Sequence, residues 1–262
     1  MTEERRGKVH LALDPENCPE AIAYFERMKD ADSVPSYQLA SDLVNCDKDK
    51  DMPRELFGFI VSLYEDSISK GNTDAMNDLG ALYYDGRGCC QDFAKAVHYY
   101  TMAAEHGHEL ATENLGYCYY YGRSIPVDYE KAFQCFARGA FTGRLVSLYK
   151  IGDMYRKGYF VDKNPEEAFK IYERCLELMT GHDEWYVAGP VYLRLGYMYL
   201  DGFGTEKDAF IALKCFQEAE CFLYNMVADC DVMYTGSLKA SVSGQERARS
   251  ELAGKLHVRS WP

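Results

Sequence analysis

Two serine–lysine pairs are the residues of this chain whose spacing best fits nucleophilic chemistry. Ser67 stands three residues before Lys70, and Ser147 stands three residues before Lys150. In an S-x-x-K motif the serine hydroxyl attacks the substrate and the lysine is a candidate base. Neither pair is accompanied by the S-D-N or K-T-G elements that complete such a site. We therefore interpret Ser147 and Lys150 as ordinary helix positions and expect a protein without enzyme activity.

The cysteines and histidines lack the spacing of a metal site. None of the ten cysteines forms a C-x-x-C pair, and the adjacent Cys89 and Cys90 have poor geometry for chelation. His98, His106 and His108 lie near one another without a paired cysteine. The sequence therefore predicts no metal and no cofactor, with reduced thiols that serve as small buried side chains.

Charge and hydropathy restrict the partners. The net charge of −12 over 262 residues repels phosphate backbones, so we expect no nucleic-acid binding. No stretch provides the ~18 apolar residues of a membrane span, and the N-terminus has no apolar run of signal-peptide length. We expect a cytoplasmic protein that does not bind membranes. A basic group near the C-terminus is either a solvated helix face or a docking surface for an acidic partner; it comprises Lys239, Arg247, Arg249, Lys255 and Arg259.

The elements that carry these residues repeat along the chain. An aliphatic residue and a glycine recur at residues 79–80, 115–116, 151–152 and 195–196, with steps of 36, 36 and 44 residues. A tyrosine follows each glycine by three residues, and a second glycine follows the tyrosine by three. Such a period indicates a stacked array of supersecondary units. We predict that the first glycine of each unit allows a close helix crossing, and that the second ends the helix in a left-handed conformation.

A second helix is predicted in each unit. It begins after an acid or amide of N-cap type, at Asp92, Asp128, Asn164 and Asp208. An alanine follows four residues later, and an aromatic residue four residues after that, which places both on one helix face; these aromatic residues are Tyr100, Phe136, Tyr172 and Phe216.

Weaker copies flank the four clear units. Leu43-Val44 and Leu63-Tyr64 fit a degenerate unit before them, Cys230-Asp231 and Tyr234 fit another after them, and an extra helix is expected near residues 19–29. We expect an N-terminal extension with a capping helix at 1–35, a repeat array at 36–256 with clear repeats at 72–220, and a tail at 257–262.

This pattern resembles the Sel-one-like repeat, which belongs to the tetratricopeptide-like superfamily of helical hairpins. The segments that carry it best run from Ala75 to Gly86 and from Asp92 to Ala96. The resemblance implies an all-α fold, a right-handed α-solenoid of about six helical hairpins, and a role in binding proteins. The chain departs from the pattern at Ser124, Ile151 and Phe160, and it has eight additional residues around 180–190 that include Trp185. Trp185 either packs back onto the solenoid or forms a protruding partner contact.

In related solenoids the first helix of each hairpin lines the concave groove. Carried over by position, the resemblance predicts as partner-binding residues Asn77, Tyr84, Glu113, Tyr117, Tyr120, Tyr121, Tyr149, Arg156 and Tyr197, and we add Trp185. The same positions include Ala81, Asp85, Asp153, Lys157, Leu193, Leu200 and Asp201. Tyrosines supply apolar area and hydrogen bonds together, which suits recognition of a peptide or a protein surface. An alternative is that superhelical twist buries some of them.

Three classes of function follow. The first is a non-catalytic, monomeric module that binds a protein or peptide partner as an adaptor, a regulator or an immunity-type inhibitor. The second is a β-lactam-binding hydrolase, because some cysteine-rich secreted relatives have been linked to β-lactam binding. The third is a scaffold that assembles from copies of itself.

Overall fold

The computed structural model describes residues 8, 12, 14, 17–30, 35–45, 52–179, 185–228 and 234–257 of the chain. Every regular element within these residues is a helix. The chain divides into two compact units, residues 1–128 and 129–262, and each is described by itself. No helix of the described part combines the length and the apolar character that crossing a membrane requires.

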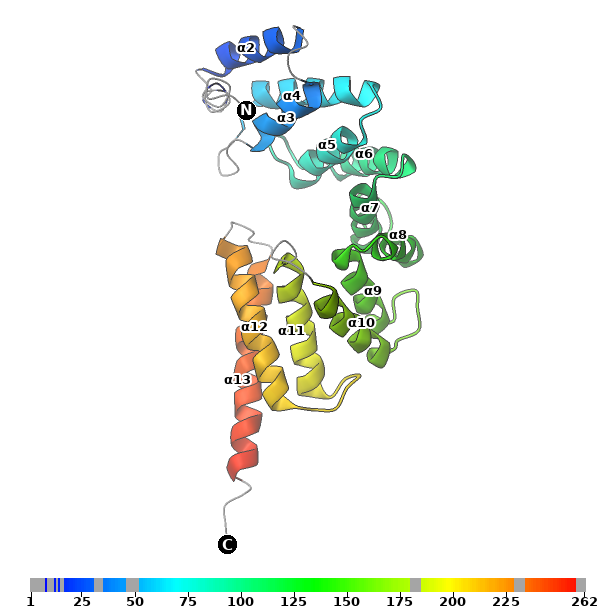
Figure 1. The fold of residues 1–262 in the computed structure, drawn as a ribbon, viewed down its shortest axis with the longest axis vertical. Coiled ribbons are helices and arrows are strands. Elements are labelled where there is room, and N and C mark those ends of the chain that lie inside the picture. The colour runs from blue at the N-terminus through cyan, green and yellow to red at the C-terminus, as the bar shows by residue number, and fades with distance from the viewer. Residues whose placement is uncertain are drawn as a thin grey trace. The chain divides into compact units, whose positions relative to one another are not determined.

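The first unit is a stack of helices in which α2 packs on α4, and from α3 onward each helix packs on the next (Figure 1). Helices α3 and α4 form one packed pair, and α5 and α6 form the next. The helices of this unit are α2 (Cys18–Asp30), α3 (Ser36–Asn45), α4 (Arg54–Ser69), α5 (Thr73–Asp85), α6 (Phe93–Glu105) and α7 (Glu109–Tyr121). Their apolar faces enclose a core that contains Leu43, Leu63 and Tyr64.

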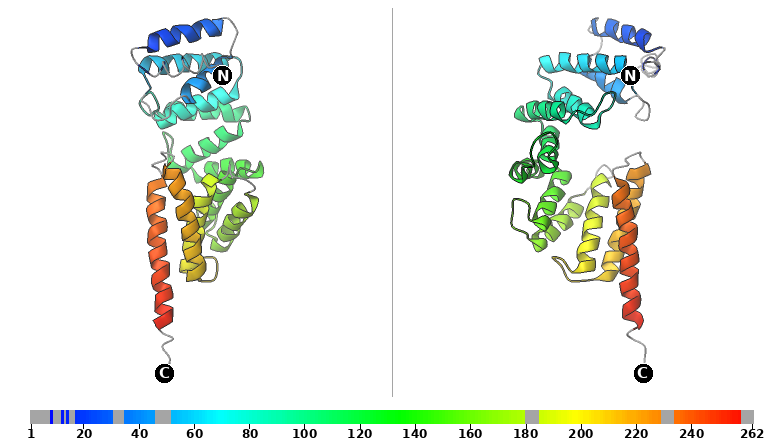
Figure 2. Two further views of the ribbon diagram at one scale, coloured as in Figure 1. Left: turned by 60° about the vertical axis from the view of Figure 1, so that its left-hand side comes forward. Right: turned by 180° about the vertical axis from the view of Figure 1, so that it is seen from behind.

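The second unit continues the same pairing and ends in two long helices. Figure 2 shows α13 running alongside α12, and these two helices share many contacts. The helices of this unit are α8 (Tyr129–Phe141), α9 (Leu145–Lys157), α10 (Pro165–Leu178), α11 (Trp185–Asp201), α12 (Ala209–Ala228) and α13 (Thr235–His257). Tyr172 and Phe216 are fully buried in its core.

The predicted helix ends are confirmed where the structure describes their caps. Asp92 accepts hydrogen bonds from the backbone N–H groups of Ala94 and Lys95, and Asn164 accepts one from Glu167. Asp208 accepts two in the same way at the start of α12. Gly86 ends α5 with φ of +72°, the left-handed conformation that a helix C-terminus favours.

We call the first glycine of each clear repeat, at residues 80, 116, 152 and 196, a ladder glycine. The predicted close approach of the two helices at these glycines is confirmed in three of the four repeats. A Cβ atom on Gly80 would lie 2.8 Å from the Tyr100 ring. A Cβ atom on Gly152 would lie 2.7 Å from the Tyr172 ring, and one on Gly196 would lie 2.7 Å from the Phe216 ring. Each glycine therefore allows the aromatic residue of the second helix to lie directly on the backbone of the first.

The flanking units follow the prediction at one end of the chain and depart from it at the other. Leu43 and Leu63 lie in the pair α3–α4, and α2 is the expected extra helix. At the C-terminal end the expected degenerate unit is the single continuous helix α13, which begins just after Tyr234. Cys230 and residues 258–262 of the predicted tail lie outside the described residues.

The additional residues before the fourth clear repeat lengthen its first helix. Residues 180–184 lie outside the described part, but residues 185–190 form the first turns of α11. This helix has 17 residues, whereas α5, α7 and α9 have 13 each. Val187 and Ala188 of the added turns are fully buried, and Tyr186 is exposed. Part of the insertion therefore extends the core of the second unit.

Candidate functional site

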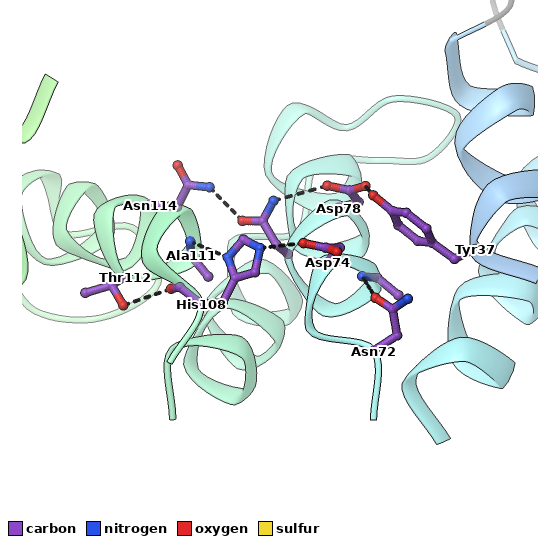
Figure 3. Close-up of polar contacts among 10 residues, drawn as sticks. Tyr37, Asn72, Asp74, Asp78, His108, Ala111, Thr112 and Asn114 are labelled. Carbon is purple, nitrogen blue, oxygen red and sulfur yellow. Dashed lines mark hydrogen bonds and ion pairs between the residues drawn. The ribbon is translucent and has the colours of Figure 1, made fainter. Parts of the chain in front are cut away.

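Polar side chains join the first helices of successive pairs in the first unit. Tyr37 of α3 donates a hydrogen bond to Asp78 Oδ2 of α5 at 3.0 Å, and Asn77 Nδ2 donates to Asp78 Oδ1 at 3.1 Å (Figure 3). Asn114 of α7 donates to Asn77 Oδ1 at 3.1 Å. These contacts run from α3 through α5 to α7, which we call the first-helix layer of the first unit.

The Asp78 carboxylate is held by neutral donors. Within the described residues its hydrogen bonds come from Tyr37 and Asn77, and burial raises the pKa of its carboxyl, opposed by these two bonds. Burial and the charge of Asp78 also raise the pKa of Tyr37 to about 12. A partly buried carboxylate without a cationic partner loses hydration that neutral donors restore only in part.

His108 connects the same layer at the start of α7. Its Nδ1 accepts a hydrogen bond from the backbone N–H of Ala111 at 3.1 Å, so the ring proton resides on Nε2. That nitrogen lies 3.0 Å from Asp74 Oδ1 and donates to it (Figure 3). A histidine thus serves as the N-cap of α7 and as a link to α5.

An aromatic cluster with one arginine lies at the C-terminal ends of α5 and α7. Tyr84 packs edge-on against Phe93 at 5.1 Å, and the Arg123 guanidinium lies over Phe93 at 4.9 Å. Arg123 also lies 5.9 Å from the Tyr121 ring, which stacks with Tyr117 at 6.1 Å. Burial raises the pKa of the Tyr84 hydroxyl, and a hydrogen bond from Arg123 opposes this shift. We call these five residues the Tyr84–Arg123 cluster; Tyr121 is 49% exposed and Arg123 is also exposed.

In the second unit a largely buried ion pair joins the first helices α9 and α11, which we call the first-helix layer of the second unit. Arg194 of α11 donates to both carboxylate oxygens of Asp153 on α9, at 2.5 and 2.6 Å. Tyr172 of α10 donates to Asp153 Oδ1 at 2.7 Å, and the Arg194 guanidinium lies 5.0 Å from the Tyr149 ring. Next along the layer, Tyr197 donates to the backbone carbonyl of Ala240 on α13 at 3.0 Å.

The charges of this group set its protonation. Burial favours the neutral form of Asp153, but the charge and hydrogen bonds of Arg194 outweigh it and hold the pKa of the carboxyl well below its usual range. Lys150 adds to the same shift. The Asp153 charge in turn keeps the pKa of Arg194 above its ordinary value in spite of burial. The pair is therefore fully ionised at neutral pH.

The structure separates the predicted partner-binding residues into buried and accessible ones. Asn77, Glu113, Tyr120 and Tyr149 are at most 6% exposed, and Asp153, Leu193 and Leu200 are also buried. These side chains pack within the protein, as the alternative interpretation expected, and offer little surface to a partner. The accessible ones are Tyr84, Tyr117, Tyr121, Arg156, Tyr197, Ala81, Asp85, Lys157 and Asp201. Trp185 begins α11, and its side chain lies outside the described part.

Sequence reasoning missed several polar residues of the first-helix layers. Asp78 and Arg194 both immediately precede the aliphatic residue that stands before a ladder glycine. The equivalent residues of the other two clear units are Asn114 and Lys150, so this position is polar in all four. A position that is polar in every repeat, next to one that is always apolar, could have indicated these buried polar contacts. His108 gave no such signal, because histidine is an unusual N-cap residue.

Ser67, Ser147 and Lys150 occupy ordinary helix positions, and Lys70 is the C-cap residue of α4. Ser67 is 5% exposed and its hydroxyl donates to the backbone carbonyl of Leu63, while Lys70 pairs with Asp66 at 2.8 Å. Ser147 is fully buried and Lys150 is 5% exposed. Among the described residues no group of three histidine, cysteine, aspartate or glutamate side chains could hold a metal ion.

Two solved structures share this fold. One is a protective antigen present in uropathogenic Escherichia coli strains that displays an SLR fold, with 20% sequence identity and a TM-score of 0.60 over 88% of this chain and 49% of the antigen chain. This chain thus spans about half the length of that relative. The other is a Sel1 repeat protein from Oxalobacter formigenes, with 24% identity and a TM-score of 0.55 over 79% of this chain and 76% of the other. At these identities the likeness shows the fold alone, and no curated protein matches the chain.

The family model of the Sel1 repeat matches four segments of the chain, at residues 73–108, 110–140, 145–175 and 190–220. These segments coincide with the helix pairs from α5–α6 through α11–α12. Sel1 repeat proteins are typically protein-interaction modules. The helix pairs, the ladder glycines and the four matches agree, and the chain belongs to the Sel1 repeat family.

Proposed function

We propose that this protein is a non-catalytic interaction module that binds a segment of a partner protein along its first-helix layers. The observation that carries this proposal is the Tyr84–Arg123 cluster. It combines exposed tyrosine with arginine, the residue types that contribute most to protein–protein binding energy. Its rings already pack on one another, so little side-chain entropy remains to be lost when a partner covers them.

The role of such a module depends on its partner. An adaptor, a regulator and an immunity-type inhibitor all fit a non-catalytic solenoid. The net charge of −12 favours a basic partner, because opposite charges accelerate association. An association rate that falls steeply with added salt would support the inhibitor role, whereas a rate insensitive to salt would count against it.

Affinity purification from native lysate tests the proposal. The intact protein is compared with the double variant Tyr121→Ala/Arg123→Ala, whose side chains are exposed, so that the fold is retained. A matched control is Tyr224→Ala/Arg174→Ala, which removes an exposed tyrosine and an exposed arginine from α12 and α10. We expect the partner, once purified, to bind the cluster variant at least about tenfold more weakly and the control normally.

Two results would contradict the proposal. Equal binding of the partner to both variants would place the contact away from the cluster. A mass that rises with concentration in light scattering, together with no captured partner, would favour the scaffold alternative. Turnover of a chromogenic β-lactam that is lost in Ser67→Ala or Ser147→Ala would instead revive the hydrolase alternative.

A further inference from the structure

The guanidinium of Arg156 has unused hydrogen-bonding capacity. It lies on α9, and its nearest carboxylate atom is Asp153 Oδ1 at 3.8 Å, which is beyond hydrogen-bonding distance. Its Nε is buried without a hydrogen-bond partner, although the side chain as a whole is 33% exposed. Among the described residues no hydrogen bond donated by this guanidinium is found.

Asp153 cannot readily satisfy Arg156 by a small movement. Its Oδ1 already accepts hydrogen bonds from Arg194 Nε and the Tyr172 hydroxyl, and its Oδ2 accepts one from Arg194. Arg194 is fixed in turn by its bond to the carbonyl of Pro190 and by the Tyr149 ring. The buried pair is therefore complete without Arg156, and two arginines face one carboxylate.

We propose that Arg156 binds the side-chain carboxylate of an aspartate or glutamate in a protein segment held on the first-helix layer of the second unit. This inference rests on the proposed interaction function and specifies the chemistry of one contact. The planar fork of a guanidinium matches a carboxylate with two parallel hydrogen bonds. The partly buried setting strengthens such a pair, because fewer waters compete for it.

The charges favour a carboxylate over a phosphate. Asp153 is already paired with Arg194, so the Arg156 guanidinium itself offers a ligand one positive charge, whereas a phosphate would bring close to two negative charges. The second phosphate charge would face the Asp153 carboxylate at short range. Burial favours a side chain over a chain terminus, because a carboxylate on a flexible stem reaches a recessed guanidinium while its backbone stays outside.

NMR titration of the full-length protein tests this inference. The side-chain Nε–H signals of arginine are followed while acetyl-Ala-Leu-Glu-Leu-Ala-amide is added, and the same peptide with glutamine in place of glutamate is the control. We expect the Arg156 signal to shift with the glutamate peptide and to shift far less with the glutamine peptide. Arg156→Gln should weaken binding of the glutamate peptide by about ten- to a hundredfold, the usual contribution of a charged hydrogen bond.

Further variants and peptides make the result decisive. Arg174→Gln, which removes an exposed arginine of α10, should leave the affinity unchanged, and Arg156→Lys should retain part of it. Tighter binding at Arg156 of a phosphoserine peptide, or of the glutamine peptide with a free C-terminal carboxylate, would overturn the inference. So would the absence of any Arg156 shift. If the peptides still shift signals of Tyr197 or Tyr121 in that case, the inference fails while the interaction function stands.

Discussion

Arg194 of α11 and Asp153 of α9 form a two-pronged ion pair, with nitrogen–oxygen distances of 2.5 and 2.6 Å. The Asp153 side chain is 3% exposed and that of Arg194 is 21% exposed. The pair therefore links two successive first helices beneath the surface of the second unit. In the first unit the hydrogen bond from Tyr37 to Asp78 makes the corresponding link between α3 and α5. Buried polar links of this kind favour one register between successive repeats, because a slipped register would leave the Asp153 charge unpaired and would remove the Tyr37 donor from Asp78.

Breaking the pair from one side should destabilise the protein strongly. We expect Asp153→Asn to lower the free energy of unfolding by about 3–5 kcal/mol, because it leaves the Arg194 charge buried without a counter-ion. Denaturation by urea, followed by circular dichroism, measures this loss. Glu177→Gln breaks an exposed pair with Arg174 and should change stability by less than about 1 kcal/mol. The single variant Arg194→Gln and the double variant Asp153→Asn/Arg194→Gln complete the comparison. If the double variant loses as much stability as the two single variants lose in sum, the two side chains are not coupled and the argument fails.

The pH dependence of stability should have opposite signs at Asp153 and Asp78. The pKa of Asp153 is lowered in the folded protein from its ordinary value of 3.8, so its stabilisation is present above that value and is lost as the pH falls below it. The pKa of Asp78 is raised, so its ionised form destabilises the fold at neutral pH. Relative to Asp78→Asn, the native protein should gain stability between pH 7 and about pH 4. Relative to Asp153→Asn, it should keep a constant advantage over that range and lose it only below.

Urea denaturation of the native protein and both variants at several pH values checks these signs. Comparing each variant with the native protein cancels the titration of all other groups. An Asp78→Asn difference that is flat between pH 7 and pH 4 would show that Asp78 titrates normally. A decline in the Asp153→Asn difference above pH 5 would show that Arg194 does not dominate the pKa of Asp153.

Most of the fold could be predicted from the sequence because its determinants repeat. Gly80, Gly152 and Gly196 recur at fixed positions, and each meets an aromatic side chain that recurs in the same way. Helix starts such as Asp92 and Asn164 follow from local chemistry, since an acid or amide caps the helix that follows it. Helix α13 has no such repetition, so one long helix could not be distinguished from a degenerate pair.

The candidate site was predicted less well because position on a helix does not determine burial. Tyr120 and Tyr121 are neighbours in sequence, yet they are 6% and 49% exposed. Tyr149 fits the position of a groove residue, but it is buried and the Arg194 guanidinium lies over its ring. Such contacts depend on residues about 40 positions away, and no local pattern identifies which polar side chain will find a buried partner.

Two glycines of the first unit should respond to alanine in opposite ways. Gly80→Ala should destabilise the protein by about 1–3 kcal/mol, because the new Cβ would lie 2.8 Å from the ring of buried Tyr100. Gly58→Ala on α4 should stabilise it by about 0.5–1 kcal/mol, because nothing lies within 4 Å and alanine favours a helix. Thermal and urea unfolding of the two variants measure both effects. A stabilising Gly80→Ala would show that Tyr100 can move aside and that close approach does not explain the ladder.

The N-cap role of His108 can be separated from its link to Asp74. His108→Ala should cost about 1 kcal/mol, because the N–H of Ala111 loses its acceptor. His108→Asn should recover most of this loss, since asparagine is a good N-cap residue. Asp74→Asn should have little effect, because the Asp74 side chain is 62% exposed. If His108→Asn is as unstable as His108→Ala while Asp74→Asn is equally unstable, the contact with Asp74 is the important one.

In all four clear repeats the second residue after the helix-ending glycine adopts a left-handed backbone conformation. Only two of the four repeats have glycine at this position. The φ angles are +78° at Gly88, +59° at Ser124, +66° at Phe160 and +77° at Gly204. A residue with a side chain in this conformation is strained by about 1–2 kcal/mol. At Gly204 a Cβ would also overlap the backbone carbonyl of Pro165.

Substitutions at this position should therefore change stability in opposite directions. Gly204→Ala should destabilise the protein by about 2–4 kcal/mol, because backbone strain adds to a clash with main-chain atoms that cannot rotate away. Ser124→Gly should leave stability unchanged or raise it by up to about 1 kcal/mol, since relief of strain exceeds the extra chain entropy of glycine in the unfolded state. Unfolding free energies of both variants decide the matter. A clearly destabilising Ser124→Gly would mean that the serine side chain, rather than the backbone, is what this loop requires.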